Sequence, residues 1–215
     1  MRLPLSSHPT RASPWRPRLR RTVTGVTSAV AQQKRVLYLV ACGTPEARRL
    51  PELIAQAQDQ NWVVCVLATP QGYKYLDASL LEELTGHPVR HEYKQPGDVD
   101  ALPPAEAMIV CPATFNTINK WASGIADTLA LSLLTEAIGL GLPLVAAPML
   151  NSAQAAHPAF DKSLEVLRSV GVNVLYGPGV WEPGAPGTGA SRHYDWSLPL
   201  KAMNAMLDSK TTPHA

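Results

Sequence analysis

Short apolar runs alternate with segments of helical periodicity along most of the chain after residue 33. The runs are continuous and rich in β-branched residues, which is typical of strands buried on both faces of a parallel sheet. Strong patterns predict strands at Arg35–Cys42, Trp62–Ala68, Met108–Cys111 and Leu144–Ala147. Weaker patterns predict further strands at Val89–Tyr93 and Val172–Tyr176.

Between these runs, apolar residues recur every three or four positions, which predicts helices. The expected helices cover Glu46–Gln60, Tyr73–Leu84, Thr128–Leu140, Pro158–Val170 and Ser197–Leu207. Strands that alternate with helices predict an α/β fold, a three-layer α/β/α sandwich with a parallel, doubly wound sheet. Pro112 is expected to end its strand, and Asp127 to cap the helix that follows it.

Small polar residues follow the strong strands at the points where these end: Gly43 and Thr44, Thr69, Thr114 and Asn116, and Asn151. A parallel sheet brings the carboxyl ends of its strands to one edge, where ligands bind in open α/β folds. This convergence predicts a site for a nucleotide-sized ligand, with a phosphate at a turn or helix start. The alternative is that these residues are ordinary helix caps, since Ser, Thr and Asn are favoured there.

Common nucleotide and metal motifs are absent from the sequence. No Gly-x-Gly-x-x-Gly follows the first strand, and no Gly-x-x-x-x-Gly-Lys-Ser/Thr occurs. The three cysteines, Cys42, Cys65 and Cys111, include no Cys-x-x-Cys pair and lie in or beside apolar runs. We therefore expect no metal site and no disulfide framework, but buried thiols in a reducing cytoplasm.

Charge is distributed unevenly along the chain. Residues 1–33 hold six of the 19 Lys and Arg residues and no Asp or Glu, which leaves 13 basic against 17 acidic residues, or −4, in the remainder. We expect a disordered basic extension at 1–33, with a twin-arginine export signal as the alternative, a folded domain at 34–208 and a tail at 209–215. The mildly acidic body predicts no nucleic-acid partner, and no apolar run reaches the ~18 residues that span a membrane.

The segment from Pro112 to Asp127, PATFNTINKWASGIAD, resembles the Pro-Ala-Ser/Thr-x-Asn-Thr segment and following Gly-Ile-x-Asp of a known family. This family comprises the FMN-binding flavoproteins that include phosphopantothenoylcysteine decarboxylase and the lantibiotic peptidyl-cysteine decarboxylases. The similarity extends over roughly Arg35–Tyr176. It implies a flavodoxin-like (Rossmann-like) sheet and FMN bound between the subunits of a homotrimer or a multiple of trimers.

The resemblance also implies roles for individual residues. Gly43, Thr44 and Thr69 match turns that receive the FMN phosphate. The segment around flavin and substrate is matched by Pro112, Ala113, Thr114, Asn116 and Thr117. Asn151 matches the Asn of the family's Pro-x-Met-Asn-x-x-Met-Trp motif, which contacts the substrate carboxylate, and Gly177–Arg192 matches the family's substrate flap.

The chain departs from the family pattern at several positions. Counting back from Pro112 places Asp98 where the decarboxylases have a catalytic His, and His91 could serve only with a shifted alignment. Leu150, Gln154 and Ala155 replace other motif residues, and the predicted flap contains no cysteine. Asp98 could act as a base only if burial raised its pKa.

The resemblance implies an FMN-dependent lyase, carboxy-lyase-like, or a related oxidoreductase that acts on a small or peptidyl thiol substrate bearing a carboxylate. Asn151 and Asp98 are its candidate catalytic residues. The departures keep open the alternative of an FMN-binding carrier or regulatory protein without decarboxylase activity. A flavin prenyltransferase-like activity is a third possibility, which the sequence favours less.

Overall fold

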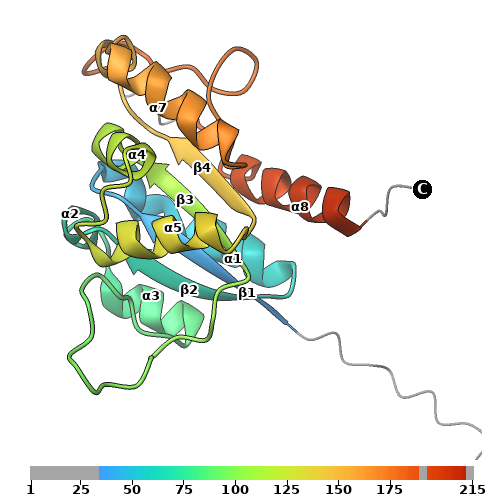
Figure 1. Cartoon of the computed structure of the whole chain (residues 1–215). Coiled ribbons are helices and arrows are strands. Elements are labelled where there is room, and N and C mark those ends of the chain that lie inside the picture. Colours follow the sequence, from blue (N-terminus) through green and yellow to red (C-terminus); the bar gives the residue numbers. More distant parts are fainter. Residues whose placement is uncertain (1–33, 189–192, 212–215) are drawn as a thin grey trace, which may run out of the picture. The chain divides into compact units, whose positions relative to one another are not determined.

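In the computed structural model, which describes residues 34–188 and 193–211, five parallel strands form one sheet in the order β2-β1-β3-β4-β5 (Figure 1). The strands are β1 (Arg35–Ala41), β2 (Trp62–Ala68), β3 (Ala107–Ala113), β4 (Leu144–Pro148) and β5 (Asn173–Val174). The predicted extension at 1–33, the last four residues of the predicted flap and residues 212–215 of the predicted tail lie outside the described residues.

Helices connect the strands and cover the sheet on both faces. They are η1 (Pro45–Arg49), α1 (Leu50–Asp59), α2 (Pro70–Tyr73), α3 (Ala78–Thr85), α4 (Phe115–Ala122), α5 (Leu129–Gly139), α6 (Ser152–Ala155), α7 (Pro158–Ser169) and α8 (Leu198–Thr211). Helices α1, α3 and α8 contribute to the core on one face, and α4, α5 and α7 to the core on the other.

Successive residues of each strand enter opposite cores. In β1, Leu37 and Leu39 pack with the first group of helices, whereas Tyr38 and Val40 pack with the second. This alternation is the expected consequence of side chains that point to opposite faces of a strand. Both faces are buried, which explains the continuous apolar runs and confirms the predicted three-layer α/β/α sandwich.

The order of the strands places a topological switch point between β1 and β3. The chain moves from β1 outward to β2 and then returns past β1 to β3, β4 and β5. This order is the flavodoxin-like one, in which ligands bind outside the carboxyl ends of the strands at the switch point. The arrowheads of β2, β3 and β4 point to the same edge, on the side of α2 and α4 (Figure 1).

The first strand–helix unit forms as its sequence predicts. Helix α1 begins at Leu50 with Pro51 in its first turn, where a missing N–H costs no hydrogen bond. Its apolar face, Leu50, Leu53, Ile54 and Ala57, is fully buried. The preceding turn is a separate 3₁₀ helix, η1, rather than part of the expected helix from Glu46.

Pro112 does not end its strand, contrary to the prediction. Strand β3 continues to Ala113 through a cis Cys111–Pro112 peptide bond, and its register with β4 shifts between Val110 and Ala113. The carbonyls of Pro112, within the shift, and Ala113, after it, still accept hydrogen bonds, from the Cys42 N–H at 3.1 Å and the Met149 N–H at 2.8 Å respectively. A proline removes a donor only, so the strand continues past Pro112 with its carbonyls bonded.

Two further predictions were wrong in detail. Thr128, not Asp127, caps α5, because its hydroxyl accepts the N–H of Leu131 at 3.3 Å. The Val89–Tyr93 run contributes a single bridge, in which the Arg90 carbonyl accepts the Ala68 N–H at 2.8 Å. At the carboxyl end of the chain, α8 extends to Thr211, into the predicted tail.

Candidate functional site

A cavity of about 990 Å³ lies at the edge of the sheet where the strands end. Loops that follow four neighbouring strands supply its walls, and the described segment of the predicted flap closes one side. The lining residues include Gly43, Thr44, Glu46, Thr69, Gln71, Thr114, Phe115, Asn116, Thr117, Lys120, Met149, Leu150, Asn151, Gln154, Gly184, Ala185 and Gly187. The position and the polar lining agree with the predicted ligand edge.

The loop after β1 approaches the start of α2 so closely that glycine is required in both. A Cβ on Gly43 would lie 2.7 Å from the Cβ of Gln71, and one on Gly72 would lie 2.3 Å from the Ala41 carbonyl oxygen. Thr44 adopts an extended backbone, and its hydroxyl donates to the Glu46 carboxylate. The cavity wall at β1 is therefore made of backbone, one hydroxyl and one carboxylate.

Thr69 connects β2 to α2 and is almost completely buried. Its backbone N–H donates to the Ala41 carbonyl at 2.9 Å, and its hydroxyl accepts the N–H of Gly72 at 3.0 Å. The first bond joins the end of β2 to the end of β1, and the second caps α2. Thr69 thus caps α2 and also lines the cavity, so its role as a cap does not remove it from the candidate site.

Thr114 caps α4 and forms a hydroxyl pair at the end of β3. Its Oγ1 accepts the Thr117 N–H at 3.4 Å and lies 3.1 Å from the Thr117 Oγ1. The Cys42 thiol hydrogen-bonds with both threonines, which partly offsets the rise that burial causes in its pKa. The thiol therefore stays protonated at neutral pH.

Asn116 and Asn119 belong to the same helix but serve different purposes. Asn116 is exposed on the cavity wall. Asn119 instead joins α4 to α7, since its amide donates to the Phe115 carbonyl at 2.9 Å and its oxygen accepts the Ser163 hydroxyl at 2.7 Å. The helix thus presents only part of its polar residues to the cavity.

The described cavity lining contains two charged side chains, Glu46 and Lys120. Lys120 forms an ion pair with Asp127, with 2.5 Å between Nζ and Oδ2. This pair joins the end of α4 to the turn before α5, so Asp127 serves as an ion-pair partner and not as a cap. The lysine chain still contributes to the cavity wall.

Asn151 and Gln154 close the cavity at the end of β4 through a reciprocal capping box on α6. The Asn151 Oδ1 accepts the Gln154 N–H at 2.9 Å, and the Gln154 Oε1 accepts the Asn151 N–H at 3.4 Å. The Ser152 N–H donates to the Gly184 carbonyl at 2.9 Å, which attaches the flap to this helix. We use "flap" for residues 177–188, the described part of the predicted segment.

A chain of aromatic rings holds the base of the flap. Trp181 lies 6.3 Å from Tyr176 and 6.0 Å from Tyr194, measured between ring centroids, and both contacts are edge-to-face. Its backbone also pairs with Gly177 in an antiparallel bridge. The flap is therefore fixed at its base and, through Gly184, at α6.

Three of the predicted site residues are not in the cavity lining. Pro112 and Ala113 are buried within β3, beneath the cavity. Asp98 lies in the exposed loop before β3, where its carboxylate accepts the Gln95 N–H at 3.0 Å. The other candidates, Gly43, Thr44, Thr69, Thr114, Asn116, Thr117 and Asn151, meet in the cavity.

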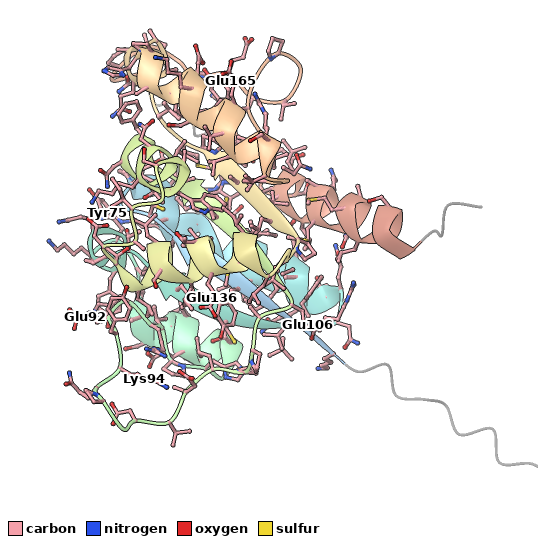
Figure 2. All side chains as sticks on the ribbon, viewed as in Figure 1. Tyr75, Glu92, Lys94, Glu106, Glu136 and Glu165 are labelled. Carbon is pink, nitrogen blue, oxygen red and sulfur yellow. The ribbon has the colours of Figure 1, made fainter. Side chains whose placement is uncertain are left out.

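The loop that carries Asp98 also carries His91. Figure 2 shows Glu92 and Lys94 on this long loop, away from the edge where β3 and β4 end. His91 stacks on Tyr73 of α2, with 3.7 Å between ring centroids. Neither His91 nor Asp98 reaches the cavity of its own chain, because the loop runs past the outer side of β2.

Sequence reasoning missed Glu46, Gln71 and Lys120 as cavity residues and treated Gln154 only as a departure from a motif. Glu46 and Gln71 are close in sequence to predicted positions, so a wider window at each strand end would have found them. The described residues contain no cluster of His, Cys, Asp and Glu that could hold a metal ion. No described helix is long and apolar enough to cross a membrane.

A parallel sheet of this order, with a polar cavity at its switch point, is typical of flavodoxin-like nucleotide-binding proteins. Comparison with protein families makes the class specific, because the Flavoprotein family matches residues 26–195. The chain belongs to the Flavoprotein family.

Curated relatives include a decarboxylase and a protein of coenzyme A biosynthesis. A cysteine/cysteine sulfinic acid decarboxylase from an unknown prokaryotic organism is 34% identical over 118 residues, which are 52% of this chain and 32% of that protein. The coenzyme A biosynthesis bifunctional protein CoaBC of Thermococcus kodakarensis is 38% identical over 71 residues, 33% of this chain and 17% of that protein. The matched region thus spans a third or less of the length of these relatives.

Solved structures confirm the fold. The FMN-dependent cysteine decarboxylase SpaF superposes with a TM-score of 0.59 at 23% identity, covering 79% of this chain and 97% of SpaF. The cypemycin decarboxylase CypD gives a TM-score of 0.63 at 21% identity, covering 84% of this chain and 97% of CypD. This similarity extends over nearly the whole of both decarboxylases.

Proposed function

We propose that the chain binds FMN in the cavity and is an FMN-dependent enzyme of the carboxy-lyase type. Its substrate is a small or peptidyl thiol that carries a carboxylate. The observation that carries the proposal is the meeting of Thr44, Thr69, Thr114, Asn116 and Asn151 in one cavity at the switch point. The names of the relatives, which include cysteine decarboxylases, support the same chemistry.

The cavity lining fits a flavin mononucleotide in size and in most of its chemistry. A volume of about 990 Å³ is at the upper end of the range for ligand pockets. Thr44 and Thr69 would hold the phosphate, since hydroxyl and backbone donors at these turns suit an anion. Glu46 opposes this placement, because a phosphate beside Thr44 has to displace the Glu46 carboxylate from that hydroxyl.

When bound, FMN supplies a two-electron oxidation of the thiol-bearing carbon chain, which makes loss of the carboxylate easier. Thr114, Thr117 and Asn116 would orient the flavin and the substrate beside it. Asn151 would hold the substrate carboxylate through its amide, and the flap would exclude water from the reacting groups.

The visible absorbance spectrum of the purified full-length protein tests the cofactor. Flavin bands close to one FMN per chain are expected. A folded, colourless protein that also fails to bind added FMN would contradict both the cofactor and every role that depends on it.

A second candidate function is an FMN-binding carrier or regulatory protein without decarboxylase activity. It is favoured by the absence of Asp98 and His91 from the described cavity lining, which leaves Glu46 as its one carboxylate. Release of CO₂ from a peptide that ends in cysteine, with loss of the reaction in Asn151→Ala, would eliminate this candidate. Asp98 can act only if a neighbouring subunit places it in another chain's cavity.

We also propose a homotrimer in the cytoplasm, with residues 34–208 as the flavin-binding domain. Exposed apolar side chains at Val99 and Leu140, 89% and 66% exposed, support contact between subunits. Three free, buried cysteines suit a reducing compartment. Sedimentation as a monomer would contradict the homotrimer, and recovery outside the cytoplasm would contradict the location. A colourless protein after truncation at Gln33 would contradict the assignment of flavin binding to residues 34–208.

A further inference from the structure

The turn after β1 contains a carboxylate beside the hydroxyl that is proposed to hold the phosphate. The Thr44 hydroxyl donates a hydrogen bond to the Glu46 carboxylate, and both side chains line the cavity. Glu46 is the one acidic side chain of the described lining. The chain itself therefore supplies an anion to the hydroxyl at the end of β1.

Thr44 can offer an anion only its hydroxyl. Its backbone N–H already donates to the Cys42 carbonyl at 2.9 Å. The next residue, Pro45, has no N–H. A hydroxyl has a single hydrogen, so it can donate to the Glu46 carboxylate or to a phosphate oxygen, but not to both at once.

Electrostatic repulsion acts in the same direction as this competition. A phosphate beside Thr44 would lie close to the Glu46 carboxylate, and like charges in a cavity are screened less than in water. Glu46 is only half-buried, so its carboxylate can rotate away from Thr44 toward solvent. A phosphate can therefore bind, but only after the hydrogen bond between Thr44 and Glu46 breaks.

A neutral hydroxyl group of a ligand does not require this change. It can donate to the Glu46 carboxylate while Thr44 keeps its own bond, since a carboxylate has about four acceptor positions. Riboflavin and FMN provide the contrast, because they share the ring and the ribityl chain and differ only in the terminal phosphate. Contacts with the shared part cancel when the two affinities are expressed as a ratio.

We propose that Glu46 is a specificity-determining residue of the cavity. Its carboxylate competes with the phosphate of FMN for the Thr44 hydroxyl, and so reduces the preference of the protein for FMN over riboflavin. This role rests on the proposed function for the flavin and for the place of its phosphate beside Thr44.

Two variants separate the charge of Glu46 from its hydrogen bond. Glu46→Gln removes the charge and keeps an oxygen that can accept from Thr44, whereas Glu46→Ala removes both. Glu165→Gln is the matched control, because it removes the same charge from an exposed residue outside the cavity lining. Figure 2 shows Glu165 on α7.

The probes are FMN and riboflavin, titrated into the full-length protein after removal of any bound flavin, with binding followed by flavin fluorescence. Glu46→Ala should bind FMN about tenfold more tightly than wild type, as expected when a hydrogen bond to a charged group no longer has to break. Glu46→Gln should gain about threefold. Riboflavin binding should change less than about twofold in both variants, and Glu165→Gln should leave both affinities unchanged.

Thr44→Val tests whether the hydroxyl is the group for which the two anions compete. Valine has a similar shape but no hydroxyl, so it leaves the carboxylate and the phosphate without a shared donor. In this background, Glu46→Ala should improve FMN binding less than about threefold. A gain of the full tenfold would show that Glu46 acts without Thr44, and would overturn the competition.

The remaining outcomes distinguish this role from the proposed function. If wild type binds flavin and Glu46→Ala leaves the ratio of FMN to riboflavin affinity unchanged, the role of Glu46 is wrong and the proposed function stands. An equal loss of both affinities in Glu46→Ala would show that the carboxylate only maintains the turn, which also overturns the role. Failure of every variant and of wild type to bind either flavin would contradict the proposed cofactor, and the role of Glu46 with it.

Discussion

Several residues of the site serve the fold and the cavity together. Thr69 and Thr114 each cap a helix with the oxygen that also contributes to the cavity wall. Glycine has an equally local purpose in α2, where Gly72 allows the helix to approach the Ala41 carbonyl. The edge of the sheet is thus shaped by contacts too close for larger side chains.

The Gly72 contact can be tested by adding a single methyl group. Gly72→Ala would place its Cβ 2.3 Å from a backbone oxygen that cannot move aside, so we expect a loss of stability of about 3 kcal/mol or more. Urea unfolding followed by far-UV circular dichroism measures the change.

Gly139→Ala is the matched control for this substitution. No heavy atom lies within 4 Å of its added Cβ, and the position is helical. Alanine should stabilise the protein there by about 0.5–1 kcal/mol. Equal effects of the two substitutions would show that close packing is not the reason why position 72 requires a glycine.

Among the secondary-structure elements, those with a regular hydrophobic pattern were predicted well. Strand β2 has the predicted bounds, and α1 buries the predicted face. The pattern says nothing about hydrogen-bond partners, so it missed the continuation of β3 through Pro112 and the Thr128 cap of α5. Contacts with the neighbouring strands explain the first, and a local hydrogen bond from the Leu131 N–H to Thr128 explains the second.

The site was predictable to the extent that topology determines it. Parallel strands had to bring Thr44, Thr69, Thr114 and Asn151 to one edge. Asp98 was assigned to the position of the family's catalytic His by counting back from Pro112 through a loop. That count fails wherever the loop differs in length from the loop of the family. The orientation of the α6 amides depends on a reciprocal cap that no spacing rule specifies.

The flap depends on its aromatic base, which suggests a test at the level of this element. Trp181→Ala removes the ring between Tyr176 and Tyr194, so the flap should open more often. Because Ser152 donates to Gly184 of the flap, its amide should exchange with deuterium about tenfold faster, a change equivalent to ~1.4 kcal/mol.

Val180→Ala provides the control for the flap experiment. Val180 is 45% exposed and adjoins Trp181 in sequence, so its truncation should leave exchange at Ser152 unchanged. Exchange in the central strand β1 should be unaffected by either substitution, since its hydrogen bonds are within the sheet. Faster exchange throughout the sheet in Trp181→Ala would indicate global destabilisation instead.

For the whole molecule, buried tyrosine and cysteine side chains limit the stability of the fold at high pH. Burial raises the pKa of Tyr38 to about 12 from an ordinary 10.0, and that of Cys65 to about 11 from 9.0. The unfolded chain therefore releases these protons first as pH rises. Stability is fully present below about pH 9 and is lost progressively up to about pH 12.

Tyr38→Phe should reduce this loss by up to about 2 kcal/mol, measured as the difference in the free energy of unfolding between pH 9 and pH 12. The proteins are compared by the slope of the free energy of unfolding against pH. The absolute stability is not suitable, because the variant also loses the hydrogen bond from the Tyr38 hydroxyl to the Pro103 carbonyl at 2.8 Å. Tyr93→Phe, at a tyrosine that is 55% exposed, should leave the slope unchanged. Identical slopes in all three proteins would contradict the burial argument.

The two edges of the sheet have a consequence for assembly and for handling the protein. At one edge, β5 is only two residues long, and at the other, Arg90 occupies the backbone groups beside Leu67 of β2. Short and interrupted edges are poor templates for a strand from another molecule, so they protect a β protein from edge-to-edge aggregation. Copies of this chain should therefore associate through helices and loops, not by extending the sheet into a fibre.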